Sequence, residues 1–262
     1  MTDRTAADDA YANGAHIPNG EGYYARWEAE AAAFRDGHKL KELDVSYGPK
    51  VRQVYDMYHP ARAAKGTVIF VHGGYWLAGA PLMFSHLGRG AVEAGYACAT
   101  PSYTLAPDAK VAEMTVEVAA ACAAIAKRTE GPIYLAGHSA GGHLVARMGC
   151  ADMAADWSAR VARIMAISPL SDLEPLRGTT MNDTLGIDAA EALAESPIRH
   201  SPQDIPVTVW VGSDERPVFL DQAAWLHAAW GCDMTVDAGR HHFDVIEGLE
   251  DPTSAMMRVL LS

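Results

Sequence analysis

The stretch "YLAGHSAGGHL", residues 134–144, places one serine between two glycines directly after an apolar run. Residues Gly137 to Gly141 match the pattern G-x-S-x-G, in which a serine lies on a sharp turn from a strand into a helix. Glycines two positions before and after the serine avoid the clash that larger side chains would make across the turn. The hydroxyl of Ser139 would then stand exposed above a sheet, at the positive end of a helix. The pattern favours Ser139 as a nucleophile, although by itself it also fits a glycine-rich turn with an incidental serine.

A second motif, "FVHGGYW" at residues 70–76, ends another apolar run well before the serine. An H-G-G-x run in this position supplies the oxyanion hole in sites that use a G-x-S-x-G turn. Its glycines let backbone N–H groups face a developing negative charge with no Cβ in the way. We therefore expect the N–H groups of Gly74, Tyr75 and Ala140 to be the donors. His72 is expected to brace this loop rather than to act as a base.

A triad of this type needs a carboxylate and then a histidine later in the chain. The C-terminal segment "GRHHFDVIEGL" offers His242 as the base, with His241 expected to face solvent. The acid is expected on the loop after the apolar run 207–212, three residues beyond the glycine that ends it, which selects Glu215. Asp214 is the alternative acid, because aspartate is the residue type that most triads use. Adjacent residues of an extended loop point apart, so only one of the two carboxylates is expected to reach the histidine.

Elsewhere the sequence alternates apolar strand-like runs with helical segments. The expected strands are residues 51–60 on a sheet edge, 67–74, 96–103, 132–137, 163–168 and 207–212. The expected helices are residues 82–95, 108–128 with Asp108 as N-cap, 140–153 and 217–230. This alternation predicts one α/β domain over residues 1–262, with a mostly parallel central sheet and helices on both faces.

The alternation breaks between residues 172 and 204, where proline and glycine interrupt short helical pieces. Ligand pockets of parallel sheets form outside the carboxyl ends of the strands, where such insertions lie. We therefore interpret residues 172–204 as a small lid.

Composition excludes several partners. A formal net charge of −12 and the lack of a basic run argue against a nucleic-acid partner or an anionic membrane surface. The polar, acidic N-terminus has no signal-peptide pattern, and no apolar run is long enough to span a bilayer. The sequence leaves the oligomeric state open, a homo-oligomer included.

The cysteines indicate neither a metal site nor a disulfide framework. They are scattered with no C-x-x-C pair, and each sits in an apolar stretch, which is typical of small buried hydrophobic residues: Cys98, Cys122, Cys150 and Cys232. Unpaired thiols suit a reducing cytoplasm, so we expect a cytoplasmic protein. There is no H-E-x-x-H or other metal-ligand spacing, and no catalytic metal is expected.

Taken together, "HGGYW", "GHSAGGHL", "VGSDERPVFLDQ" and "HHFDVI" resemble the serine-dependent kynurenine formamidase (arylformamidase) group of α/β-hydrolases. The resemblance runs over nearly the whole chain. It implies an α/β-hydrolase fold and hydrolysis of an N-formyl aryl amide or a small ester without a cofactor. It places the nucleophile on Ser139, the base on His242 and the oxyanion loop after His72. The acid position departs from the group, because Glu215 stands where formamidases carry aspartate, with Asp214 one residue earlier.

Two other functions remain compatible with the sequence. A short-chain carboxylesterase or thioesterase would use the same residues, and a non-catalytic hydrolase fold would bind a ligand without turning it over. A small-molecule ester or formamide with a small acyl group is the expected substrate. Trp76 is expected to line an aromatic pocket. Further candidates for that pocket are Tyr23, Tyr24, Tyr103 and Phe219.

Overall fold

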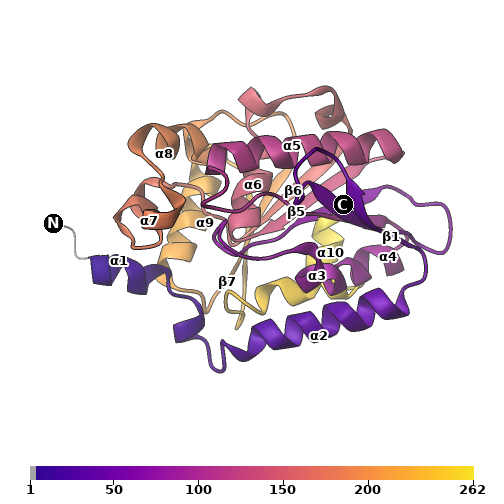
Figure 1. Ribbon diagram of the computed structural model, residues 1–262, viewed down its shortest axis with the longest axis horizontal. Coiled ribbons are helices and arrows are strands. Elements are labelled where there is room, and N and C mark those ends of the chain that lie inside the picture. The colour runs from indigo at the N-terminus through magenta and orange to yellow at the C-terminus, as the bar shows by residue number, and fades with distance from the viewer. Residues whose placement is uncertain (1–3) are drawn as a thin grey trace.

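The computed structural model describes residues 4–262, which are built around one eight-stranded sheet (Figure 1). The strands are β1 (Lys41–Ser46), β2 (Val54–Tyr58), β3 (Thr67–Val71), β4 (Ala97–Pro101), β5 (Ile133–His138), β6 (Val161–Ile167), β7 (Val207–Gly212) and β8 (Asp233–Asp237). Their order across the sheet is β1-β2-β4-β3-β5-β6-β7-β8. β2 runs antiparallel to β1 and β4, and the neighbouring pairs from β4 to β8 are parallel.

Helices cover both faces of the sheet. The α-helices are α1 (Arg4–Tyr11), α2 (Gly22–Gly37), α3 (Pro81–Phe84), α4 (Arg89–Glu93), α5 (Val111–Arg128), α6 (Ala140–Met148), α7 (Asn182–Leu185), α8 (Ala189–Glu195), α9 (Pro217–Trp230) and α10 (Ala255–Leu260). The short 3₁₀ helices are η1 (Gly14–His16), η2 (Ser85–Gly88), η3 (Ala151–Met153), η4 (Asp156–Arg160), η5 (Glu174–Gly178), η6 (Pro197–Arg199) and η7 (Val245–Glu250). Within residues 4–262, no helix combines the length and the apolar character that crossing a membrane requires.

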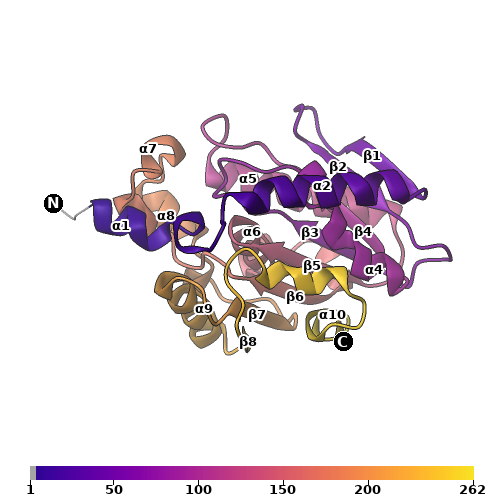
Figure 2. The ribbon, with the colours of Figure 1, turned by 90° about the horizontal axis from the view of Figure 1, so that it is seen from below.

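The core has two layers, one on each side of the sheet. Helices α5, α6 and α9 pack on one face, where Leu144 and Val118 are among the fully buried residues. On the other face lie α2, α3, α4, η7 and α10, with Trp27 and Met257 in the second apolar cluster (Figures 1 and 2). Every residue of β3, β4, β5 and β7 is buried, as expected for parallel strands covered on both faces.

This architecture confirms the predicted α/β-hydrolase type of fold with its mostly parallel sheet. The helix at 217–230 has the predicted bounds, and each expected strand has a counterpart. The strand expected at 51–60 is shorter, and β1 pairs with it on the outside, so it is not at the sheet edge.

Three predicted helices differ from the structure. The helix expected over 140–153 ends at Met148, with Gly149 as its C-cap, and residues 151–153 form the separate 3₁₀ helix η3. The helix expected from Asp108 begins at Val111, because the Glu113 carboxylate accepts a hydrogen bond from the Lys110 N–H at 2.8 Å and caps the first turn there. The helix expected over 82–95 is divided into α3, η2 and α4. Gly90 in α4 lies so close to η7 that a Cβ on it would be 2.4 Å from the Leu249 carbonyl oxygen.

The segment 172–204 contains the expected short helices η5, α7, α8 and η6. It packs against the N-terminal helix α1. The guanidinium of Arg4 donates to Asp183 at 2.7 Å, and the N–H of Thr180 donates to the Asp8 carboxylate at 2.6 Å. Figure 1 shows α1 beside α7 at one end of the molecule.

The packing of α6 under β3 gives a first prediction. A Cβ on Gly141 would lie 2.0 Å from the Val71 carbonyl oxygen, and backbone of a central strand cannot move aside. We expect Gly141→Ala to lower the free energy of unfolding by about 3 kcal/mol or more, measured by chemical denaturation. Gly178→Ala is the matched control, because a Cβ there meets nothing within 4 Å, and its effect should stay within about 0.5 kcal/mol. Equal stability of the two variants would contradict this account of the turn.

Candidate active site

Ser139 occupies the sharp turn between β5 and α6. Its backbone has φ 56° and ψ −118°, a conformation that non-glycine residues rarely adopt. Its N–H donates to the Ile167 carbonyl at the end of β6, at 2.9 Å. The flanking glycines are required because a Cβ on Gly137 would lie 2.2 Å from the Gly141 carbonyl oxygen. The G-x-S-x-G pattern therefore forms the strand–turn–helix that the sequence predicted.

The H-G-G-Y-W loop lies directly against this turn. A Cβ on Gly73 would come within 3.0 Å of the Ser139 Cβ. The next two residues, Gly74 and Tyr75, have φ of 109° and 52°, so the loop backbone turns back on itself. In the described part of the chain, no protein acceptor pairs with the N–H groups of Gly74, Tyr75 or Ala140. Three free donors therefore lie close to the serine, as an oxyanion hole requires.

The two candidate acids point in different directions. The Nδ1 of His242 lies 2.6 Å from Glu215 Oε2, and both side chains are buried. Asp214 is exposed and its carboxylate accepts from Ser213 at 2.8 Å. Of the two neighbours, Glu215 reaches the histidine and Asp214 does not.

The second oxygen of Glu215 is also held. Glu215 Oε1 accepts a hydrogen bond from the N–H of Gly212 at 2.9 Å and another from the hydroxyl of Ser168. Ser168 is fully buried and has φ 46°. The sequence analysis missed Ser168, since a serine at the end of an apolar strand carries no distinguishing signal.

The other histidines near the turn have partners of their own. His138 Nε2 donates to the His242 carbonyl oxygen at 2.8 Å, and burial lowers the pKa of His138 well below its ordinary value. His72 Nδ1 donates to the Gly73 carbonyl at 2.8 Å, and burial lowers its pKa to about 4. His143 Nε2 donates to the Glu195 carbonyl at 2.7 Å. His241 contacts the Tyr23 hydroxyl at 3.1 Å and its side chain is only 18% exposed, so it does not face solvent as expected.

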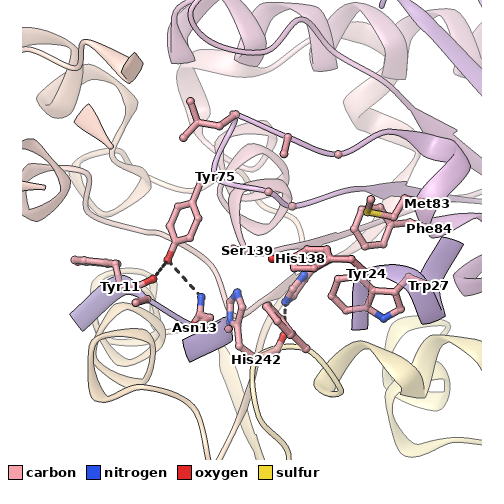
Figure 3. A pocket seen from close by; sticks show the side chains of 18 residues that line it. Tyr11, Asn13, Tyr24, Trp27, Tyr75, Met83, Phe84, His138, Ser139 and His242 are labelled. Atoms are coloured by element: carbon pink, nitrogen blue, oxygen red, sulfur yellow. Dashed lines mark hydrogen bonds between the residues drawn. The ribbon is translucent and has the colours of Figure 1, made fainter. Parts of the chain in front are cut away.

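Ser139 and His242 line one cavity of about 370 Å³ (Figure 3). Its walls come from the H-G-G-Y-W loop, from α2 and α3, and from the chain just after α1. Aromatic side chains gather on one side of the serine. The ring centroid of Trp27 lies 5.3 Å from those of Phe84 and Phe243 and 5.7 Å from that of Tyr24. The site therefore combines a serine, a paired histidine and an apolar aromatic pocket.

Trp76 does not line this cavity, so that prediction is wrong. Its side chain is fully buried in the core and packs edge-on against His143, with ring centroids 5.1 Å apart. A φ of 58° directs it away from the pocket side of the loop. Of the further candidates, Tyr24 lines the cavity. Tyr103 stacks on His72 and Phe219 packs on the His242 ring instead.

The lid interpretation of residues 172–204 also fails at this cavity. Among the residues that the structure describes, none from 172–204 lines the cavity. The N-terminal residues 11–14 cover the pocket instead: the Tyr75 hydroxyl donates to the Tyr11 carbonyl at 2.6 Å and accepts from Asn13 Nδ2 at 3.3 Å. We call residues 11–14 the N-terminal strap. This short stretch, Tyr-Ala-Asn-Gly, gave no sequence signal for a pocket wall.

One group of side chains has metal-ligand types close together, away from the cavity. Ligand atoms of Glu30, His86 and Glu250 lie within 4.8 Å of one another. Arg89 pairs with Glu250 at 2.9 Å and Arg26 lies 3.8 Å from Glu30, so both carboxylates already have cationic partners.

A family model described as the alpha/beta hydrolase fold matches residues 68–227. The chain belongs to this family. The match includes the H-G-G-Y-W loop, the serine turn and Glu215. Together with the similarity of the chain to kynurenine formamidases, this match makes it an enzyme of the serine hydrolase superfamily.

The proteins to which this hydrolase is similar include formamidases, a putative thioesterase and an esterase. It is 27% identical to a kynurenine formamidase of Danio rerio over 84% of this chain and 80% of that protein. A kynurenine formamidase of Drosophila melanogaster is 26% identical over 80% of this chain and 77% of its own. Among solved structures, a putative thioesterase from Silicibacter sp. TM1040 has a TM-score of 0.96 and 46% identity, covering 97% of this chain and 98% of that one. Esterase B from Lactobacillus rhamnosis, at 20% identity and a TM-score of 0.70 over 92% of both chains, shares the fold.

The hydroxyl of Tyr75 joins the strap of this hydrolase to the H-G-G-Y-W loop, which gives a second prediction. Burial raises the pKa of Tyr75 well above its ordinary value, so the hydroxyl stays a donor. Tyr75→Phe removes two hydrogen bonds and should lower the free energy of unfolding by about 1–2 kcal/mol. It should also speed amide hydrogen exchange at residues 11–14.

Tyr24→Phe is the matched control, because Tyr24 lines the same cavity and its hydroxyl has no protein partner within residues 4–262. Faster exchange in both variants, or in neither, would show that the Tyr75 hydroxyl does not hold the strap.

Proposed function

We propose that this hydrolase cleaves an N-formyl aryl amide or a small ester through Ser139, His242 and Glu215. The 2.6 Å contact between Glu215 and His242 carries the proposal, since the histidine and the serine line the same cavity. The free N–H groups beside the serine and the similarity to kynurenine formamidases support it.

In the first half-reaction, Ser139 Oγ attacks the carbonyl carbon while His242 Nε2 takes the hydroxyl proton. Glu215 accepts the Nδ1–H, which fixes the tautomer that leaves Nε2 free to act as a base. The alkoxide of the tetrahedral intermediate receives hydrogen bonds from the N–H groups of Gly74, Tyr75 and Ala140. His242 then gives its proton to the departing amine or alcohol.

In the second half-reaction, water repeats the sequence on the formyl- or acyl-enzyme. His242 takes a proton from the water, the oxyanion forms at the same donors, and collapse releases the acid and restores Ser139. Each proton that leaves the nucleophile returns to a leaving group, so the cycle closes without a cofactor.

A carboxylesterase or thioesterase acting on short acyl groups is the alternative, and the 46% identity to a putative thioesterase favours it. Initial rates with an aryl formamide, an aryl acetate and an acetyl thioester, measured on one preparation, separate these activities. A non-catalytic binding fold has no need to keep the serine, the histidine and the buried carboxylate together.

Removal of the nucleophile tests the proposal directly. Ser139→Ala should lower turnover by on the order of a million-fold while the fold stays intact. A fluorophosphonate probe should label the wild-type protein at Ser139 and leave the variant unlabelled. Activity above a few per cent of wild type in a clean Ser139→Ala preparation, or no adduct on the folded wild-type protein, would overturn the assignment.

The acid is tested by a pair of neighbours. Glu215→Gln should lower kcat by roughly three to four orders of magnitude, because the amide no longer orients the imidazole or stabilises its charged form. Asp214→Asn is the matched control and should cost far less. The reverse ranking would move the acid to Asp214, and two mild effects would mean that the partner of His242 lies outside this loop.

A further inference from the structure

The cavity beside Ser139 has an uncharged wall. Among the described residues that form its walls there is no Asp, Glu, Lys or Arg. We infer that the substrate group held in this cavity is a neutral aryl group, and that zwitterionic aryl substrates such as N-formylkynurenine are poor ones. This inference rests on the proposed function and defines the substrate class of the same site.

The apolar wall suits a flat, uncharged group. Trp27 is in edge or tilted contact with Tyr24, Phe84 and Phe243, and Met83 completes this side of the pocket (Figure 3). Such a wall gains free energy by covering apolar surface and offers aromatic faces and edges to a bound ring.

The polar groups of the cavity are already paired, or are neutral. The His138 ring donates to the His242 carbonyl, and burial keeps its pKa low, so it carries no charge at neutral pH. The Tyr75 hydroxyl is occupied by the Tyr11 carbonyl and by Asn13. One buried atom, Asn13 Oδ1, has no partner among the described residues. A single amide oxygen can accept from a neutral N–H, but it cannot compensate both charges of a zwitterion.

The charged side chains next to the cavity serve other contacts. Arg52 Nη2 donates to the Gly79 carbonyl at 2.7 Å, and the Glu215 carboxylate faces His242 Nδ1. Arg216 and Asp214 surround a small hollow behind Asn13 and His242 and do not line the main cavity. Arg216 pairs with the Asp9 carboxylate at 2.8 Å, so its charge is already matched. An ammonium or carboxylate entering the cavity would therefore lose water without gaining an ion pair, which is strongly unfavourable.

Two matched pairs of substrates test this inference. The first pair is ortho-formamidoacetophenone and N-formylkynurenine, which share the ortho-acyl formanilide and differ in the amino-acid end. The second pair is p-tolyl acetate and O-acetyltyrosine, which share the aryl acetate and differ in the same way. We expect kcat/KM of the neutral member to exceed that of the zwitterion by at least about tenfold in whichever pair is hydrolysed.

A charge placed in the wall should shift this preference. Met83→Arg adds a cation to the cavity and should raise the ratio of zwitterionic to neutral kcat/KM several-fold. Leu82→Arg adds the same charge at an adjacent, exposed position that does not line the cavity, and should leave the ratio unchanged. Met83→Gln separates the effect of charge from that of lost apolar surface.

The outcomes separate this inference from the function on which it rests. Equal or better kcat/KM for the zwitterion in an active preparation would overturn the inference and leave the hydrolase function standing. A shift of the ratio in Leu82→Arg equal to that in Met83→Arg would also overturn it, because the cavity would not be what senses the charge. Failure to hydrolyse all four compounds, with Ser139 unlabelled by fluorophosphonate, would overturn the proposed function itself.

Discussion

Ser139 holds φ 56° and ψ −118°, a conformation that costs a non-glycine residue about 1–3 kcal/mol, and the backbone packed around it prevents relaxation. The Ile167 carbonyl takes its N–H, and Gly141 lies under the Val71 carbonyl. These contacts join the carboxyl ends of β3, β5 and β6. The strain at Ser139 is therefore supported by these three strands of the sheet.

The same strand order brings together the remaining parts of the site. The H-G-G-Y-W loop follows β3, the serine turn follows β5, Ser168 follows β6 and Glu215 follows β7, and these strands are consecutive neighbours in the sheet. Their carboxyl ends meet at one edge, which is where parallel sheets bind ligands. Loops that are far apart in sequence thus need no long connections to contact one another.

The contacts of the Glu215 carboxylate fit this geometry. Its Oε2 lies 2.6 Å from His242, while its Oε1 receives the Gly212 N–H and the Ser168 hydroxyl. The glutamate side chain thus reaches the histidine with one oxygen and still has its second oxygen satisfied inside the protein. A buried carboxylate without those donors would be costly, which makes Ser168 part of the reason that glutamate is tolerated here.

Sequence reasoning predicted the buried strands and both glycine motifs because those features are local. A β-branched run buried on both faces and a turn that excludes side chains leave direct signatures in the residues. It missed β8, whose residues "DMTVD" are polar and half exposed at the sheet edge. It misplaced Trp76, whose backbone has a positive φ that cannot be predicted from the presence of a tryptophan in the sequence. The N-terminal strap was missed because its role depends on contact with Tyr75, which is remote in sequence.

The region matched by the family and the wall of the pocket only partly overlap along the chain. The family match over residues 68–227 contains Ser139, the H-G-G-Y-W loop and Glu215. Much of the pocket wall lies outside it, in the N-terminal strap, in Tyr24 and Trp27 of α2, and in Phe243. Family membership therefore supports the type of reaction, while much of the wall beside Ser139 comes from residues that the match does not include. Two hydrolases with the same G-x-S-x-G turn can differ in substrate through a helix and a strap that their shared motifs do not include.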